Sequence, residues 1–321
     1  MTFAADCFHN VPIMKRVLFI GEINVDLILG GLPSLPVLDR EIACSSCELT
    51  IGSSTAICAC AYASLGGNCS FMGLAGTDPY GDFMVRGMSE FGVRTQWVVR
   101  SPDVRTGITV NLIVGKTRSQ VTYPGSIAAF SRKHLRLDAI PGFDHVHLGG
   151  LYLQEGLLPE VTEILKVARN SGLTASIDPQ WDASESWRYL DEWLPLLTWF
   201  FPNGDEALSI TGERDLPSAC EALAARTPNP LIKHGAEGVW GWIDGRVEHI
   251  AGYPVDVVDT TGAGDSFDAA YLFAVLEKGM DARSAARFAN AAAARSCRFV
   301  GGVNARSSYE DVLEFQRRFG Q

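Results

Sequence analysis

Residues 16–21 read Arg-Val-Leu-Phe-Ile-Gly, a short apolar run that stops at a glycine. Such a run is typical of a strand buried on both faces of a parallel sheet. An Ala-rich helix is predicted at Thr55–Leu65, and it stops at Gly66-Gly67, as expected from the preference for glycine just beyond a helix C-terminus. A strand at Phe71–Leu74 and a helix at Asp82–Phe91 repeat the order. This alternation predicts a doubly wound α/β domain, with a mainly parallel sheet flanked by helices.

The same alternation returns after Phe130 and continues to the end of the chain. Strands are predicted at His145–Leu148, Thr174–Asp178, Trp199–Phe201 and Leu231–Lys233, with a hairpin-like pair from Gly238 to Ala251. Helices are predicted at Leu157–Ser171, Ser266–Lys278, Ala282–Phe299 and Tyr309–Arg318. We therefore expect one domain over residues 14–321. Residues 1–13 are either a loose N-terminal tail or lie upstream of a true start at Met14.

Two stretches, at about residues 27–49 and 97–123, break this order. They are rich in β-branched and turn residues and show no amphipathic helix, and Thr106–Val114 and Ser119–Tyr123 have the composition of strands. We expect the two stretches to form a small β-sheet lid outside the main sheet. The alternative is a set of extra edge strands on the main sheet. A lid that closes over a bound molecule would exclude water from it.

Composition narrows the classes of function. The 321 residues are 47% apolar and 20% charged, enough for a full-sized core, and the formal net charge is −10. Nucleic-acid binding draws on an excess of Lys and Arg, and a membrane span needs about 18 consecutive apolar residues, so we expect neither partner. Among the eight cysteines, Cys44-x-x-Cys47 lacks a second pair or a neighbouring His to complete a metal site. We read them as reduced thiols of a cytoplasmic protein.

Residues 255–267 read Val-Asp-Val-Val-Asp-Thr-Thr-Gly-Ala-Gly-Asp-Ser-Phe and carry the strongest chemical signal. The small residues Gly262-Ala263-Gly264 let the backbone wrap around an anion, and the free N–H groups of the following helix point at it. Asp265 beside them can accept a proton from an attacking hydroxyl. The alternative is that Asp265 only caps the helix, since Asp is a preferred N-cap residue. No Walker A pattern is present, so a nucleotide would be held in another way.

The stretch Asp259–Phe267 closely resembles the C-terminal signature of the ribokinase-like (PfkB) carbohydrate kinase family. The resemblance extends over nearly the whole chain, because further family blocks match in the expected order: Gly21–Asp26, Gly76–Gly81, Pro202–Glu206, Lys233–Gly238, Phe288–Ala291 and Gly301-Gly302. The resemblance implies a ribokinase-like fold. It also implies an ATP-dependent kinase that phosphorylates a hydroxyl group of a small sugar, sugar acid or polyol.

The family resemblance assigns roles to the residues of the phosphoryl-transfer site. Asp265 is implied to be the catalytic base, and Gly262-Ala263-Gly264 the anion hole. Asn203 and Glu206 match an Asn-x-x-Glu element associated with magnesium and phosphate placement, and Mg²⁺ prefers oxygen ligands. Taken alone, these two residues are a helix cap and an acid in the first helical turn.

The resemblance also implies sites for a nucleotide and for a monovalent cation. The nucleotide-binding candidates are Lys233, Gly235, Gly238, Thr260 and Asn290. Asp259 and Thr261 match a cation site of many relatives, which makes K⁺ a further candidate beside ATP and Mg²⁺. Simple turn chemistry is the alternative explanation for Asp259 and Thr261.

For the substrate, the resemblance points to Asn24 and Asp26 and to the segment Gly52-Ser53-Ser54. An acid at the C-terminal edge of a strand is also where open α/β sheets place ligands. The chain departs from the family here, because the usual Gly-Gly-x-x-x-Asn reads Gly52-Ser53-Ser54-Thr55-Ala56-Ile57, and Gln180 stands where many sugar kinases have Asn. Either one hydroxyl contact is lost, or the hydroxyl side chains of residues 53–55 supply it. Ribose and fructose are therefore unsafe guesses.

Two other functions stay open from the sequence. A nucleoside kinase of the same fold would need aromatic side chains against the base, and Tyr123 and Phe130 are available. A catalytically silent sugar-binding sensor is favoured by the altered segment 52–57 and opposed by the intact segment 259–265.

The predicted lid carries features that indicate which molecules the protein binds. Arg105 and Arg118 lie in or beside the predicted lid, where a cation can contact a carboxylate or phosphate of the substrate. The expected partners are a sugar-like small molecule and ATP. Exposed strand edges in the lid would favour a homodimer that pairs through it.

Overall fold

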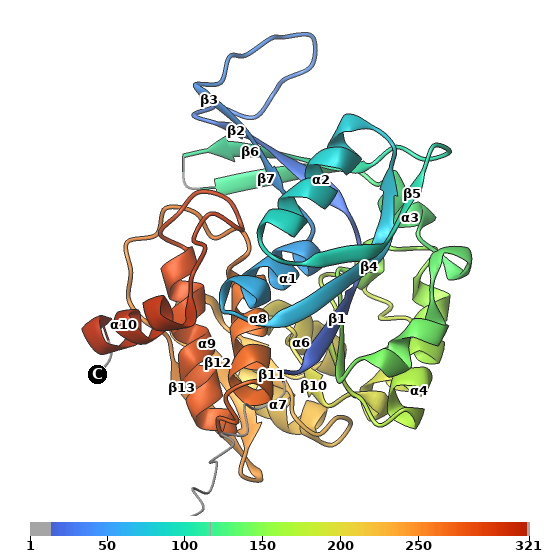
Figure 1. Cartoon of the computed structure of the whole chain (residues 1–321). Coiled ribbons are helices and arrows are strands. Elements are labelled where there is room, and N and C mark those ends of the chain that lie inside the picture. Colours follow the sequence, from blue (N-terminus) through green and yellow to red (C-terminus); the bar gives the residue numbers. More distant parts are fainter. Residues whose placement is uncertain (1–13, 116, 320–321) are drawn as a thin grey trace, which may run out of the picture.

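The protein is described by a computed structural model that covers residues 14–115 and 117–319, so the predicted tail lies outside the described residues. Its largest element is a six-stranded sheet in the order β10-β9-β8-β1-β4-β5, in which all neighbours run parallel (Figure 1). The strands are β1 (Arg16–Ile20), β4 (Asn68–Gly76), β5 (Arg94–Ser101), β8 (His145–Gly149), β9 (Thr174–Asp178) and β10 (Trp199–Phe200). The predicted mainly parallel α/β fold is confirmed.

Strand β1 lies at the centre of the sheet and is buried on both faces. Val17 and Phe19 belong to one hydrophobic cluster, and Leu18 and Ile20 belong to the other, as the two-residue period of a strand requires. One face is covered by α1 (Ser54–Ser64), α2 (Pro79–Glu90), α8 (Ala263–Leu276), α9 (Ala282–Ser296) and α10 (Tyr309–Phe319). The other is covered by α4 (Val161–Asn170), α5 (Leu190–Trp193), α6 (Gly204–Thr211) and α7 (Leu216–Ala224).

The strand order reverses at β1, and this reversal decides where a ligand can bind. Strands β4 and β5 lie on one side of β1, and β8, β9 and β10 lie on the other. In an open parallel sheet the connections on the two sides of such a point diverge and leave a crevice at the carboxyl ends of the strands. The crevice here is expected beyond Ile20 of β1 and Gly149 of β8.

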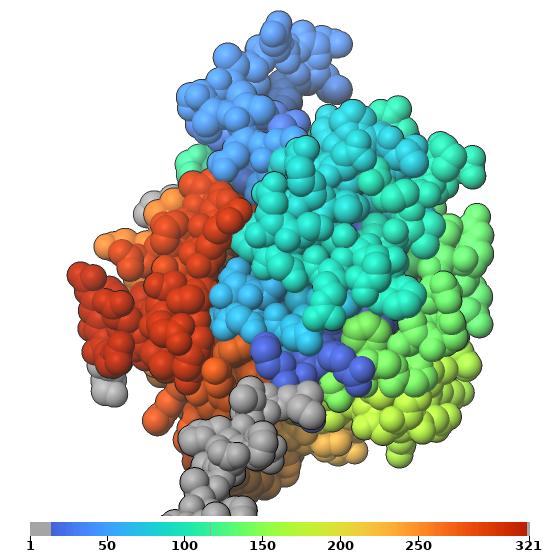
Figure 2. Space-filling view, viewed as in Figure 1, coloured from blue at the N-terminus to red at the C-terminus, as the bar shows by residue number. Residues whose placement is uncertain are grey.

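A second, four-stranded sheet is the predicted lid. Its order is β3-β2-β6-β7, with β2 and β6 parallel and the outer pairs antiparallel. The strands are β2 (Asn24–Gly30), β3 (Ser46–Ile51), β6 (Gly107–Val114) and β7 (Thr117–Tyr123), and the single turn α3 (Ser126–Ala129) follows them. Figure 2 shows the segment between β2 and β3 standing out from the body of the molecule.

The predicted lid boundaries need one correction. Residues 97–101 belong to β5, which pairs with β4 in the main sheet, so the second lid stretch does not start at 97. The physical reason is packing: Trp97 and Val99 lie against one of the two hydrophobic clusters. The same β-branched and aromatic residues that suggested a lid strand therefore serve the core.

A third sheet is small and antiparallel, in the order β11-β12-β13. Its strands are β11 (Leu231–Lys233), β12 (Gly238–Ile243) and β13 (Arg246–Ala251), so the predicted hairpin is present. Single bridges, from Phe200 to Pro230 and from Asn203 to Lys233, connect it to the end of β10. Within the described residues, no helix combines the length and apolar character needed to cross a membrane.

Candidate active site

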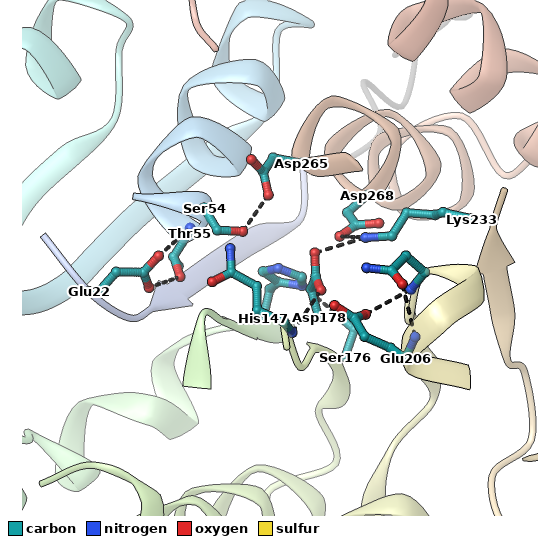
Figure 3. A network of polar contacts seen from close by, with 12 residues as sticks. Glu22, Ser54, Thr55, His147, Ser176, Asp178, Glu206, Lys233, Asp265 and Asp268 are labelled. Atoms are coloured by element: carbon teal, nitrogen blue, oxygen red, sulfur yellow. Dashed lines mark hydrogen bonds and ion pairs between the residues drawn. The ribbon is translucent and has the colours of Figure 1, made fainter. Parts of the chain in front are cut away.

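A cavity of about 450 Å³ lies between the lid and the carboxyl edge of the main sheet. It brings together eight predicted residues from distant parts of the chain, namely Asn24, Asp26, Ser53, Ser54, Glu206, Thr261, Gly262 and Asp265. Gly52 packs directly behind Asn24 and Asp26, where a Cβ atom would overlap both side chains. Figure 3 shows the acidic and hydroxyl side chains converging from α1, α8 and the ends of the strands.

Asp265 lies in the first turn of α8, at the floor of this cavity. Gly262 caps the helix in a left-handed conformation (φ 73°), and a Cβ atom there would lie 2.7 Å from the Cα atom of Gly302. Ala263 N–H donates to Thr260 O at 3.2 Å, whereas the described residues offer no acceptor to the N–H groups of Gly264 and Asp265. Two free donors at a helix N-terminus form a site for an anion.

The surroundings of Asp265 change the pKa of its carboxyl group. Burial raises its pKa to about 8, with a further contribution from the nearby charge of Asp178. A hydrogen bond from Ser54 Oγ to Asp265 Oδ1 partly offsets this rise. A carboxyl group with a pKa near neutrality is suited to accept a proton in catalysis.

Lys233 lies behind the glycine loop, in a buried ion cluster. Its Nζ atom donates to Asp178 Oδ2 at 2.8 Å and to Asp268 Oδ2 at 3.1 Å (Figure 3). Burial alone lowers the pKa of Lys233, but the two carboxylates outweigh it and hold this pKa above its usual value. Burial raises the pKa of Asp268, so we expect this carboxyl group to keep its proton while Asp178 pairs with the lysine. The side chain of Lys233 therefore points into the interior, where the two acids hold it.

The lid covers the cavity with polar side chains. Asn24 Nδ2 donates to Asp26 Oδ1 and to Thr109 Oγ1, each at 3.2 Å. Arg118 is the only Lys or Arg among the described residues that line the cavity, and its Nη1 atom donates to Thr261 Oγ1 at 2.9 Å. Burial raises the pKa of Asp26 to about 7, and the charge of Arg118 opposes this rise. Arg118 therefore connects the lid to the loop that carries the anion hole.

Arg105, which precedes β6, and Tyr123, the last residue of β7, lie outside the cavity lining. Arg105 Nε forms an ion pair with Asp78 Oδ2 at 3.5 Å, and Tyr123 is exposed. Neither residue belongs to the lining of the cavity as described.

Asn203 and Glu206 form a capping box at the start of α6. Asn203 Oδ1 accepts from Glu206 N–H at 3.0 Å, and Glu206 Oε2 accepts from Asn203 N–H at 2.8 Å. Burial raises the pKa of Glu206 to about 7, with Asp178 adding to the effect. No cluster of three metal-ligating side chains occurs in the part of the chain that is described. Glu206 lines the cavity, and proteins usually hold Mg²⁺ through one or two carboxylates together with phosphates and waters.

The predicted nucleotide residues gather where β11 turns into β12. Gly235 (φ 53°) and Gly238 (φ 99°) occupy left-handed conformations, and a Cβ atom at Gly238 would overlap Ile250 O. Asn290 Nδ2 donates to Ile250 O at 3.0 Å and to Ala251 O at 3.1 Å. The side chain amide therefore holds the end of β13 beside this turn, and contact with a nucleotide stays a prediction.

Asp259 organises the loop before the anion hole. Its Oδ1 atom accepts from Thr261 N–H and Oγ1 at 2.9 and 2.8 Å, and its Oδ2 atom accepts from Gly301 N–H at 2.9 Å. Turn chemistry accounts for these contacts, and a monovalent cation at Asp259 and Thr261 stays a prediction.

The cavity also contains residues that the sequence analysis did not single out. They are Glu22, Thr109, Gln120, Thr122, Ile127, Leu153, Trp181 and Ala183, and they line it together with Ile57 and Gln180, two positions where the chain departs from the family. One available signal was the alternation of Arg118, Gln120 and Thr122 along β7, since alternate residues of a strand share a face. For Leu153 and Trp181, which follow β8 and β9, the sequence carried no comparable pattern.

Ser53, the N-cap of α1, stands where the family has a second glycine. Its backbone is in a conformation that non-glycine residues rarely adopt (φ 68°, ψ 119°). The hydroxyl group holds it there, because Oγ donates to Glu22 O at 2.6 Å and accepts from Ala56 N–H at 2.9 Å. The start of α1 is thus fixed to the loop after β1.

Ser53 offers a stability test with a matched pair of variants. Ser53→Ala loses both hydrogen bonds and keeps the strain, so the free energy of unfolding should fall by about 1–3 kcal/mol. Ser53→Gly loses the same bonds but relieves a strain worth about 1–3 kcal/mol, so it should be the more stable of the two. Urea unfolding measures both values. Equal stabilities for the two variants would contradict a strained Ser53.

Comparison with known proteins agrees with this geometry. The profile of the pfkB family carbohydrate kinases matches residues 14–307. The chain belongs to this family. It is therefore a carbohydrate kinase, a phosphotransferase with an alcohol group as acceptor.

Relatives of this pfkB kinase differ in their sugars. Ribokinase of Bacillus subtilis is 27% identical over 305 residues, which cover 94% of this chain and 100% of the relative. Fructokinase of Vibrio alginolyticus is 26% identical over 319 residues, with 94% and 99% covered. An Escherichia coli protein solved in complex with ATP and Mg²⁺ shares the fold, with a TM-score of 0.85, 22% identity and 95% and 100% coverage.

Proposed function

We propose that this kinase transfers the γ-phosphoryl group of ATP to a hydroxyl group of a small sugar, sugar acid or polyol, with Asp265 as general base. One observation carries the proposal: Gly262 and Asp265 line the same cavity at the start of α8, where the N–H groups of Gly264 and Asp265 have no acceptor among the described residues. The carboxylate takes the proton of the attacking hydroxyl, and the amides hold the phosphoryl group. Gly262-Ala263-Gly264 supplies the turn that aims these amides.

The acceptor is held between the lid and the sheet. Asn24 and Asp26 lie on the lid strand β2 and offer an amide and a carboxyl group to the hydroxyl groups of a sugar. Gly52 supports these two side chains from behind, and Ser53 lines the cavity beside them. Closure of the lid, held by Arg118 on Thr261, excludes water, which would otherwise compete as phosphoryl acceptor.

The nucleotide binds beside the turn formed by Gly235 and Gly238. The other residues assigned to it are Thr260 and Asn290, and Lys233 supports the glycine loop from behind. Asn203 and Glu206 are the residues that would hold Mg²⁺, which neutralises the charge of the phosphates when bound. Glu206 lines the cavity, as that role requires.

One observation favours a second acceptor class. Trp181 is 43% exposed and Leu153 48% exposed, although both line the cavity. An exposed aromatic ring beside a pocket is a surface on which a planar base can stack. A nucleoside is therefore the second candidate acceptor.

A substrate panel tests the proposal. The purified protein is incubated with MgATP and single sugars, sugar acids, polyols or nucleosides, and ADP release is measured. We expect strong ADP release with one class of hydroxyl acceptor and little release with water alone. Sugar binding without ADP release from any acceptor would instead favour a silent sensor.

A further inference from the structure

Ser54 is the only side chain among the described residues that is hydrogen-bonded to Asp265. It is the first residue of α1, and its Oγ atom donates to Asp265 Oδ1 across the junction of α1 and α8 (Figure 3). Asp265 Oδ2 has no hydrogen-bond partner among the described residues. The two oxygens of one carboxylate are therefore not equivalent.

The position of Ser54 is itself fixed by its two neighbours. Ser53 Oγ donates to Glu22 O at 2.6 Å, and Thr55 Oγ1 donates to Glu22 Oε2 at 2.7 Å. Gln154 Nε2 also donates to Glu22 Oε2, at 3.2 Å. Glu22, Thr55 and Gln154 are all buried. The first turn of α1 is thus held on the loop after the central strand from both sides of Ser54, and a functional group on such a support is placed with precision.

We infer that Ser54 is a positioning residue, which orients the Asp265 carboxylate so that Oδ2 faces the acceptor and Oδ1 stays occupied. This inference rests on the proposed function, in which Asp265 is the base. The proton of the acceptor hydroxyl passes to Oδ2 as the acceptor oxygen bonds to the γ-phosphorus. The bond from that phosphorus to the bridging oxygen breaks, and ADP leaves with the electron pair. The Ser54 hydroxyl keeps its own proton throughout.

A hydrogen bond to the carboxylate also affects its protonation. A donor favours the charged form of an acid, and Ser54 acts in this direction on the pKa of Asp265. The wild-type enzyme therefore holds more ionised base at neutral pH than an enzyme without this donor. A purely structural serine would have no such effect.

The test compares Ser54→Ala with Ser54→Thr, which keeps a hydroxyl group. A hydrogen bond to a charged group contributes enough for kcat of Ser54→Ala to fall about 10- to 100-fold at neutral pH. The KM for the acceptor should change little. The acidic limb of the profile of kcat/KM against pH should move to higher pH, and Ser54→Thr should restore both the rate and the limb. Ser89→Ala, an exposed serine on α2, is the matched control.

The Ser54 and Asp265 variants test two separate claims, the positioning role of Ser54 and the role of Asp265 as the base. An unchanged pH profile and kcat in folded Ser54→Ala would overturn the role of Ser54, even if Asp265→Asn is inactive. Wild-type turnover in Asp265→Asn would instead overturn the proposed base. If Ser54→Ala does not fold, Ser54→Cys gives the same test with a weak donor of similar shape. It should show the same loss and the same direction of shift, and a wild-type profile would again contradict the inference.

Discussion

Replacement of Asp265 by Asn is expected to lower kcat by about 10²- to 10⁴-fold, because general-base catalysis contributes a factor of this size. Asn keeps the shape of the side chain and can still accept the hydrogen bond from Ser54, but it cannot take a proton. The backbone amides of the glycine loop are unchanged, so binding of MgATP should persist. Release of ADP at saturating acceptor measures kcat, and isothermal titration measures ATP binding.

The matched control for this variant is Asp103→Asn, an exposed aspartate in the turn after β5. Its kcat should equal that of the parent enzyme. The parent enzyme should also gain activity as the pH rises through about 8, because the base works only when ionised. Turnover by Asp265→Asn within a factor of about two of the parent would exclude Asp265 as the base.

Asp265 should also lower the stability of the folded protein at alkaline pH. The folded pKa of Asp265 is about 8, against an ordinary value of 3.8, so the folded state favours the protonated carboxyl group. Its contribution to stability is fully present below about pH 4 and is lost as the pH rises through about 8. Asn has no such titration. Asp265→Asn should therefore melt at a higher temperature than the parent at about pH 9, and the difference should shrink by about pH 5.

The part of the site built by adjacent residues was predictable from the sequence. In Gly262-Ala263-Gly264-Asp265, the turn, the proposed anion site and the proposed base lie within four residues, so local rules for glycine and helix ends apply directly. Asn203 and Glu206 show the limit of such rules. Their spacing predicts a capping box, whereas only the family resemblance implies a role with magnesium, and the structure shows the capping box.

The contacts between distant segments could not be predicted. Ser54 and Asp265 are 211 residues apart, and Lys233 and Asp178 are 55 apart. The family block placed Lys233 at the nucleotide, but the direction of its side chain is decided by two acids on other elements. Residues 97–101 show the same effect in the fold, because packing against the core, and not strand propensity, assigned them to the main sheet.

Removal of the Lys233 charge should have the largest effect on stability. Lys233→Met fills a similar volume but leaves the Asp178 carboxylate without its cation and Asp268 without its hydrogen-bond donor. The side chains are only 12%, 8% and 1% exposed, respectively, so water cannot replace the lost partner. Loss of one partner of a buried ion pair costs about 3–5 kcal/mol. We expect a decrease of this size in the free energy of unfolding, measured by urea denaturation with fluorescence and circular dichroism.

Two comparison variants identify the cause of the loss. Lys166→Met removes an exposed lysine on α4 and should change stability by less than about 0.5 kcal/mol. The triple variant Lys233→Met, Asp178→Asn, Asp268→Asn carries no buried charge at these positions, so it should recover much of the lost stability. If the triple variant were as unstable as Lys233→Met alone, packing of the lysine stem would be the cause. An uncompensated charge predicts recovery, because the penalty disappears when the acids are neutral.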